Sequence, residues 1–319
     1  MTSNIEVIAL SGGVGGAKLV SGLAKTLDPT RLLVIANTGD DFVHLGLHVS
    51  PDIDSIVYGT TGRNHPVNGW GRADETWNFM EMIAECGGET WFQLGDGDLA
   101  LHVLRSDWLR QGKSLSAVTC DLAAALGVPF RLLPMTDDSV STIVESDAGR
   151  LPLQTYFVRE QCRPKAKGFT YQGADQAVAQ PQFLEALEDP ALRAVVICPS
   201  NPYLSIDPIL VLPDVREALA ATRAPIIAVS PIVGGQALKG PTAKIMAELG
   251  FEPSAAAIAN HYGDLIDGFL LDEADSAERD QVLDREVEVR SAPIVMNSPK
   301  DQAVLAREVM RFADERQPA

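Results

Sequence analysis

Short runs of consecutive apolar residues recur along the chain, each followed by a polar or glycine-rich turn and then by a helix-forming stretch. Runs that are apolar at every position are typical of strands buried on both faces of a parallel sheet. They lie at residues 8–10, 32–36, 194–198, 225–229, 268–271 and 293–296, and a further run at residues 130–135 is interrupted by Arg131. The alternation with helices predicts an α/β fold with a doubly wound, mainly parallel, Rossmann-like sheet. Ligands of such sheets bind at the carboxyl ends of the strands, so we expect the function to lie in these turns.

Two stretches interrupt this rhythm. Residues 59–126 contain all the tryptophans together with many helix-forming residues, and they lack a clear buried strand. We predict a small, mainly helical insertion there, beside the strand edge, within one unit that spans residues 1–319. A later stretch alternates apolar and polar positions around a turn at Gly149, which predicts an antiparallel hairpin whose second strand is residues 154–158. Residues 300–312 have helical apolar spacing, so we expect a helix packed on the sheet.

The charge and the cysteines narrow the class of protein. A formal net charge of −17 over 319 residues argues against nucleic acid or an anionic membrane as a partner, because both require a cationic surface. The four cysteines are far apart and form no C-x-x-C pair, which is typical of reduced, buried thiols in the cytoplasm. No apolar run reaches the roughly 18 residues of a membrane span, and the first residues have no signal-peptide pattern. We therefore expect a cytoplasmic protein.

A glycine-rich loop follows the first predicted strand. Residues 11–18 read Ser-Gly-Gly-Val-Gly-Gly-Ala-Lys, so backbone N–H groups and the start of the next helix could surround a phosphate, with Lys18 nearby. The loop lacks the Gly-Lys-Ser/Thr end of a P-loop and the third small residue of the dinucleotide fingerprint. The alternative is a tight strand-to-helix turn with Lys18 in solvent.

Four aspartates follow the second predicted strand within a short stretch. Asp40, Asp41, Asp52 and Asp54 offer hard oxygen ligands on two turns that can converge at the strand edge, which suits Mg²⁺. Some of them have a structural alternative, since Asp52 after Pro51 is also typical of a helix start.

Later turns add polar groups on the same edge. Ser200 and Asn201 could hold a base or a phosphate, although both are also common in ordinary turns. Gly234 and Gly235 precede Lys239 in a second flexible, cationic loop. Two such loops on one edge indicate a ligand with more than one phosphate.

Taken together, the ordered motifs resemble the 2-phospho-L-lactate transferases of deazaflavin coenzyme F-420 biosynthesis, the CofD family. The resemblance spans nearly the whole chain. It is carried by residues 11–18 (SGGVGGAK), 37–41 (NTGDD), 50–54 (SPDID), 69–71 (GWG), 74–77 (DETW), 94–96 (LGD), 133–135 (LPM), 200–202 (SNP) and 230–232 (SPI).

The resemblance implies a transfer reaction on a doubly wound CofD-like α/β unit. A GDP-activated three-carbon acid would give its phospho-acid group to the ribityl hydroxyl of the deazaflavin Fo and release GMP. By this match Asp40 and Asp54 are the catalytic residues and the ligands of Mg²⁺. The implied substrate-binding residues are Gly12, Gly13, Gly15, Gly16, Lys18, Asp41, Asp52, Ser200, Asn201, Gly234, Gly235 and Lys239. The match also implies a homodimer that is coupled to a guanylyltransferase.

Some choices stay open at this point. The family commonly has Leu-Gly-Asp-Arg-Asp where this chain has Gly97, so Arg63, Arg72 or Arg105 is expected to replace that arginine, or the acceptor is held differently. The acid could be 2-phospholactate, phosphoenolpyruvate or a phosphoglycerate. Two other functions remain as alternatives, a regulatory protein that binds nucleotide sugars without catalysis and an NAD-dependent oxidoreductase. Asn37 argues against the second, because an acidic residue is expected there.

Overall fold

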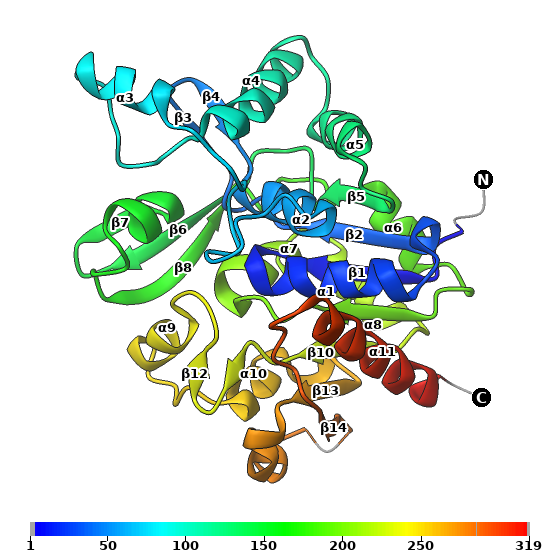
Figure 1. The fold of residues 1–319 in the computed structure, drawn as a ribbon. Helices are drawn as coiled ribbons and strands as arrows, with labels where there is room; N and C mark the ends of the chain where they lie inside the picture. The colour runs from blue at the N-terminus through cyan, green and yellow to red at the C-terminus, as the bar shows by residue number, and fades with distance from the viewer. Residues whose placement is uncertain (1–3, 285, 318–319) are drawn as a thin grey trace.

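A seven-stranded sheet forms the centre of the computed structural model, which describes residues 4–284 and 286–317 (Figure 1). In spatial order its strands are β14 (Glu288–Ser291), β13 (Gly268–Leu271), β10 (Ile226–Val229), β9 (Ala194–Ile197), β1 (Val7–Ser11), β2 (Leu32–Ala36) and β5 (Arg131–Pro134). All neighbouring strands of this sheet are parallel. The predicted fold class is confirmed, and so are the predicted strands except the last.

The last predicted strand is wrong. Residues 293–296 lie in the connection that leads into α11 (Pro299–Arg316), and the edge of the sheet is β14 instead. An edge strand has a neighbour on one side only, so its positions need not all be apolar. Arg290 of β14 forms ion pairs with Glu288 and with Glu315 of α11, which explains why this strand lacks an apolar run.

Helices cover both faces of the sheet. On one face α1 (Gly13–Thr26), α2 (Pro51–Thr61), α5 (Leu115–Leu126) and α11 share one hydrophobic cluster with Val7 and Ala9 of β1. Ile8 and Leu10 point to the opposite face, which α6 (Pro181–Leu187), α8 (Val215–Ala221), α9 (Thr242–Glu248) and α10 (Ala255–Tyr262) cover. Figure 1 shows α1, α2 and α11 across the near face. The helix predicted at 300–312 is confirmed as part of α11.

Between β2 and β5 the chain leaves the sheet. β3 (Phe42–His44) and β4 (Leu47–Val49) form an antiparallel hairpin, and α2 then returns to the core. Residues 59–126 continue with α3 (Asn78–Glu85), α4 (Asp96–Arg110) and α5, and α3 and α4 project at the top of Figure 1. These helices stand over the carboxyl end of β2, so they bring side chains to that edge.

A second, antiparallel sheet follows β5. Its order is β7 (Gly149–Pro152), β6 (Ser141–Ser146) and β8 (Ala166–Gln172). The predicted hairpin around Gly149 is confirmed, but residues 154–158 are not its second strand. Residues Thr155–Arg159 are helical, because Leu153 and Tyr156, three positions apart, both turn into the core.

Short elements complete the chain. β11 (Ile232–Val233) and β12 (Gln236–Ala237) form a small hairpin, and α7 (Asp207–Leu210) follows the turn after β9. Within residues 4–284 and 286–317, no helix combines the length and the apolar character that a bilayer crossing requires.

Candidate active site

Three central strands, β1, β2 and β9, end at the same edge of the sheet. Ser11 of β1 pairs with Ala36 of β2, and Leu10 pairs with Ile197 of β9. The turns that follow, residues 12–16, 37–41 and 198–202, therefore meet at one edge of the sheet.

The glycine loop makes its contacts with the protein itself. The N–H of Gly13, a residue with φ +62°, donates to Oδ1 of Asp52 at 2.5 Å, and the N–H of Gly12 donates to Oγ of Ser200 at 3.2 Å. A Cβ on Gly15 would overlap the carbonyl oxygen of Pro199, and one on Gly16 would overlap the hydroxyls of Ser11 and Ser200. The glycines thus let α1 approach the turn after β9 and the start of α2. Two of the amides expected to bind an anion are already bonded to side chains.

Asn37 links two carboxylates at the end of β2. Its amide nitrogen donates to Oδ2 of Asp52 at 2.9 Å and lies 3.4 Å from Oδ1 of Asp40. Burial raises the pKa of Asp52 to about 6, although the bonds from Asn37 and Gly13 oppose this. Burial, together with the charges of Asp52 and Asp41, raises the pKa of Asp40 well above its ordinary value. The cluster therefore holds more negative charge than its surroundings stabilise.

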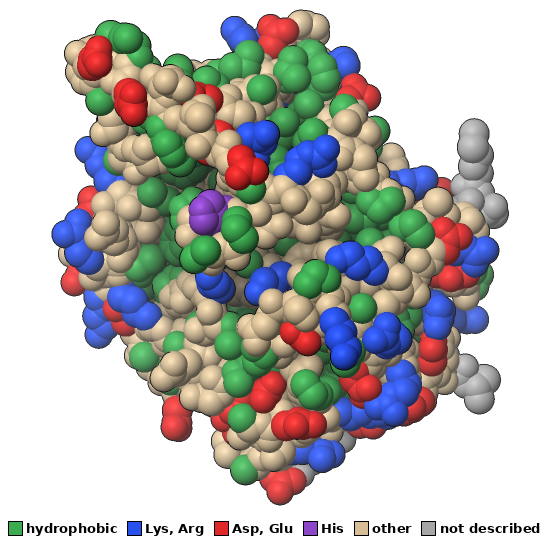
Figure 2. Space-filling view, viewed as in Figure 1, with side chains coloured by type: hydrophobic (Ala, Val, Ile, Leu, Met, Phe, Trp, Pro, Cys, Tyr) green, Lys and Arg blue, Asp and Glu red, His purple; other side chains and the backbone are tan. Residues whose placement is uncertain are grey.

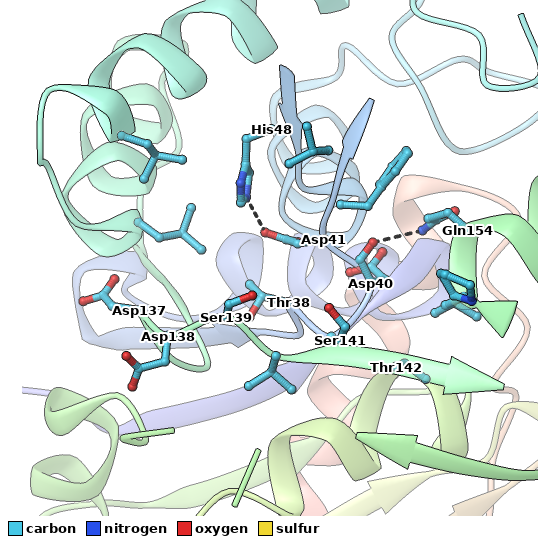
Figure 3. A pocket seen from close by; sticks show the side chains of 18 residues that line it. Thr38, Asp40, Asp41, His48, Asp137, Asp138, Ser139, Ser141, Thr142 and Gln154 are labelled. Atoms are coloured by element: carbon cyan, nitrogen blue, oxygen red, sulfur yellow. Dashed lines mark hydrogen bonds and ion pairs between the residues drawn. The ribbon is translucent and has the colours of Figure 1, made fainter. Parts of the chain in front are cut away.

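A cavity of about 500 Å³ opens beside Asp40 and Asp41 (Figure 3). Its walls come from the end of β2, from the hairpin β3–β4, from α4 and α5, and from β6 and β7. The lining residues are Thr38, Gly39, Asp40, Asp41, Phe42, Val43, His48, Leu109, Leu115, Asp137, Asp138, Ser139, Val140, Ser141, Thr142, Pro152, Leu153 and Gln154. Carboxylates, hydroxyls and apolar groups line it, and no lysine or arginine is among these described residues. Such walls suit a ligand that is uncharged and carries hydroxyl and apolar parts.

Asp41 joins the cavity to the hairpin β3–β4. One oxygen, Oδ2, lies 2.9 Å from Nε2 of His48 and accepts from Oγ of Ser50 at 2.7 Å. The other, Oδ1, is buried without a hydrogen-bond partner. Burial raises the pKa of Asp41, and the contacts with His48 and Ser50 oppose this. A buried carboxylate oxygen without a partner is unfavourable unless a ligand or ion completes it.

These observations fit a hard divalent cation. The charges of Asp52 and Asp41 raise the pKa of Asp40, the charge of Asp41 raises the pKa of Asp52, and Asp41 has a buried oxygen free. Carboxylate oxygens are the ligands that Mg²⁺ prefers, and a cation here would offset the repulsion among them.

Asp54, the other predicted metal ligand, is held by a cation of the chain. Arg105 of α4 bonds to both of its carboxylate oxygens, by Nη2 to Oδ1 and by Nη1 to Oδ2 at 3.1 Å. Arg105 Nη1 also lies 3.2 Å from Nδ1 of His102, and Nε2 of His102 is 3.1 Å from Oδ2 of Asp98. Tyr58 donates to the remaining oxygen of Asp98 at 2.5 Å. The structure therefore places Asp54 in a buried ion-pair network, whereas Asp40 lies nearer to Asp52 and Asp41.

Two lysines lie on the other side of the glycine loop. Lys18 Nζ donates to the carbonyl of Met296 at 2.8 Å, and Lys239 Nζ lies 3.2 Å from the carbonyl of Asn68. Burial, and then the charge of Lys239, lowers the pKa of Lys18. In the described part of the chain both ammonium groups bond to backbone carbonyls only. Figure 2 shows Lys and Arg side chains over the part of this face that α1 and α11 form. Unpaired neighbouring lysines in an acidic protein indicate an anion site.

The other predicted residues have structural partners. Asn201 Oδ1 accepts from the N–H of Tyr203 and of Leu204, so it caps the turn after β9. The N–H of Gly234 donates to Asp275, and Gly234 and Gly235 have φ of +59° and +71° in the β11–β12 turn. The structure brings Lys239, but not these glycines, toward the glycine loop.

Of the three arginines named as candidates to replace the one missing at position 97, Arg72 lies against that position. Its Nη1 occupies the space that a Cβ on Gly97 would take. Glu75 holds it there at 3.4 Å and also accepts from the N–H groups of Gly97 and Asp98. Arg63 instead donates to the carbonyl of Leu126. The motif at 74–77 therefore caps α4 and presents Arg72 beside its first turn.

The tryptophans do not gather into one aromatic pocket. Trp91 packs edge-on against His44 and Phe92, whereas Trp70 is 60% exposed. His44 and His48, four positions apart in the sequence, lie on the β3–β4 hairpin and not on a helix.

Sequence reasoning missed Asp98 and His102 as parts of the site, and it named Arg105 only as a candidate to replace the arginine missing at position 97. Their spacing of four and three residues places them on one face of α4. The signal that could have identified them is one helix face that carries an acid, a histidine and an arginine. The helix packs near the strand edge, and the arginine is buried.

Comparison with known proteins identifies relatives over the whole chain. A family model described as 2-phospho-L-lactate transferase CofD matches residues 7–311. The chain is 40% identical over 318 residues to a phosphoenolpyruvate transferase of Kitasatospora aureofaciens, covering 98% of each protein. It is 40% identical over 316 residues to a phosphoenolpyruvate transferase of Thermobifida fusca, covering 95% of this chain and 96% of that one.

Solved structures share the fold. A member of the UPF0052 family from Bacillus halodurans superimposes with a TM-score of 0.62 at 18% identity, covering 96% of this chain and 99% of the other. At this identity the similarity concerns the fold alone.

Proposed function

The chain belongs to the 2-phospho-L-lactate transferase CofD family, and from this membership we propose that it transfers a phospho-acid group from a GDP-linked donor to the deazaflavin Fo. The family and the whole-chain relatives make it a transferase of coenzyme F-420 biosynthesis. In the proposed reaction the ribityl oxygen of Fo forms a bond to the acid's phosphorus and loses its proton. The bond from that phosphorus to GMP breaks, so the products are a phosphodiester and GMP.

One observation carries the proposal, namely the division of charge along the strand edge. Lys18 and Lys239 lie on one side of the glycine loop, and the cavity without lysine or arginine lies on the other. Asn37 connects the two sides, because it contacts Asp40 at the cavity and Asp52, which accepts from the N–H of Gly13 at the start of α1. The diphosphate of the donor is negatively charged and the acceptor is uncharged. The side with the two lysines therefore suits the donor, and the cavity suits the acceptor.

On the donor side, the lysines would neutralise the diphosphate. Each bonds only to backbone carbonyls in the described chain, so each can turn to a phosphate oxygen without breaking an ion pair. Gly12, Gly13, Gly15 and Gly16 would form the floor by holding α1 against Ser200, with Asn201, Gly234 and Gly235 shaping the neighbouring turns. Because the N–H of Gly13 is bonded to Asp52, we assign the phosphate contacts mainly to the lysines.

On the acceptor side, the cavity would hold Fo with its ribityl hydroxyl toward the carboxylates. Asp40 and Asp54 would hold Mg²⁺, with Asp41 and Asp52 beside them. When bound, that ion would neutralise charge on the phosphoryl oxygens. Asp54, oriented by Arg105, would align the hydroxyl or accept its proton. The apolar walls would exclude water, which would otherwise compete with the hydroxyl.

For the acid we propose phosphoenolpyruvate, because relatives at 40% identity over nearly the whole chain have the name phosphoenolpyruvate transferase. We further propose a cytoplasmic homodimer that receives its donor from a guanylyltransferase.

The proposal is tested by incubating the protein with Fo, GTP, Mg²⁺, an active guanylyltransferase and each of the three candidate acids. Mass spectrometry of the products should find the enolpyruvyl phosphodiester of Fo and GMP with phosphoenolpyruvate. A product with another acid alone would correct the acid. No Fo adduct with any acid would refute the transfer to Fo.

A further inference from the structure

The buried guanidinium of Arg105 lies where three side chains of α2 and α4, each of a kind that can bind a metal ion, come together. Asp54, Asp98 and His102 each offer one ligand atom, and these atoms lie within 4.8 Å of one another. Arg105, only 1% exposed, bonds to both oxygens of Asp54 and to Nδ1 of His102. This fixed charge disfavours a metal ion between Asp54, Asp98 and His102, so the Mg²⁺ proposed for Asp40 and Asp54 would lie outside this group of three. The three side chains thus surround a cation that the chain itself supplies.

The guanidinium has further contacts through Nη1, the same nitrogen that bonds to Oδ2 of Asp54. Because Nδ1 of His102 accepts from Arg105, the ring proton is on Nε2, which lies 3.1 Å from Oδ2 of Asp98. Tyr58 donates to the other oxygen of Asp98 at 2.5 Å, and Arg105 Nη1 lies 3.4 Å from the carbonyl of His48. These contacts of Nη1 restrict the rotation of the guanidinium, although Nε of Arg105 and Nε2 of His102 are buried without a hydrogen-bond partner.

We propose that Arg105 is a positioning residue, which fixes the direction of the Asp54 carboxylate and is itself fixed by His102 and Asp98. The inference rests on the proposed function, in which Asp54 acts on the ribityl hydroxyl. The planar fork of an arginine fixes both oxygens of a carboxylate, whereas an ammonium group supplies the charge alone. Arg105 therefore contributes orientation in addition to charge. Loss of such a supporting group typically costs about 10- to 100-fold in activity or metal affinity.

Arg105→Lys separates orientation from charge. We expect a kcat about 10- to 100-fold lower, with KM values for donor and Fo within about two-fold of wild type. Mn²⁺, used as the probe metal in the absence of substrates, should bind about 10-fold more weakly. The control is Arg110→Lys on the same helix, whose side chain is 72% exposed. It should match wild type in kcat and in Mn²⁺ affinity.

A second comparison does not depend on a buried unpaired charge. Arg105→Gln alone would leave the Asp54 charge without its partner and would destabilise the fold, whereas Asp54→Asn combined with Arg105→Gln removes both charges. If Arg105 acts through Asp54, the double variant has the same kcat as Asp54→Asn alone. A further loss of about 10-fold in the double variant, or wild-type kcat and Mn²⁺ affinity in Arg105→Lys, overturns the inference. If the wild type transfers nothing to Fo, the proposed function fails, and Mn²⁺ affinity alone then decides the role of Arg105.

Discussion

Raising the pH should destabilise the metal-free protein through Asp52. Burial raises the pKa of this carboxyl from 3.8 to about 6, against the bonds from Asn37 and Gly13. Between these two values the folded protein retains a proton that the unfolded chain has released. The contribution to stability is therefore complete below pH 3.8 and is lost as the pH rises through about 6.

The size of the effect follows from the two pKa values. A pKa of about 6 in place of 3.8 corresponds to about 3 kcal/mol, at about 1.4 kcal/mol per pKa unit. About 2 kcal/mol of this loss falls between about pH 4.5 and about pH 8. The pKa values of Asp40 and Asp41 are also raised, so the wild type alone does not isolate Asp52. The difference between wild type and Asp52→Asn reports the Asp52 carboxyl together with its effect on Asp40.

The assay is urea unfolding with a chelator at a series of pH values. Asparagine keeps an acceptor for the N–H of Gly13 but cannot titrate. It also removes the charge that helps to raise the pKa of Asp40, and this second effect changes the difference from wild type in the same direction. Between about pH 4.5 and about pH 8, the stability of Asp52→Asn relative to wild type should rise by about 2 kcal/mol. Asp107→Asn, at an exposed position of α4, is the control and should stay within about 0.5 kcal/mol of wild type. A difference between wild type and Asp52→Asn that is flat with pH, or that changes in the opposite direction, would refute the reasoning.

Three further predictions concern the metal, the donor and the glycine loop. In wild type, Mg²⁺ at about 100 times its Kd should raise the free energy of unfolding by about 2.7 kcal/mol. In Asp40→Asn this stabilisation and the turnover should both be lost. An equal stabilisation of the variant by Mg²⁺ would show that Asp40 is not a metal ligand. Lys239→Ala should lower kcat/KM for the donor about 10- to 100-fold without raising the KM for Fo. The control is Lys167→Ala, on the exposed side of β8. Equal effects of the two substitutions would count against the anion site. Gly15→Ala should destabilise the folded protein by about 1–3 kcal/mol or more, because its Cβ would overlap the carbonyl of Pro199. The control Gly168→Ala, with open space around its Cβ, should stay within about 0.5 kcal/mol of wild type. Thermal unfolding compares the two variants, and equal stability would contradict the packing argument.

The sequence was most informative where burial is complete. The strands β1, β2, β9, β10 and β13 are buried at every position, so continuous apolar runs marked them. β14 has a neighbour on one side only and carries Glu288 and Arg290, so no such run exists. The helical turn after Leu153 was predicted as a strand because alternation over so few residues does not distinguish the two periods.

The residues of the site also differ in how well the sequence predicted them. The glycine loop and the aspartates follow strand ends, so their place at one edge was visible in the sequence. Their partners were not, since Arg105 lies 51 residues from Asp54 and Ser200 lies 188 residues from Gly12. Such pairs are formed by the tertiary fold. They changed the interpretation of Asp52, which caps α1, and of Asp54, which is paired with an arginine.

The most direct test of a transferase at this edge is the stoichiometry of one reaction. The purified enolpyruvyl-GDP donor, Fo and Mg²⁺ are mixed with the protein, and GMP and the Fo phosphodiester are quantified together over time. The account predicts that both products appear in equal amounts, and that omission of Fo suppresses GMP release. GMP released without a matching amount of the Fo phosphodiester, or no release of GMP in the complete mixture, would contradict it.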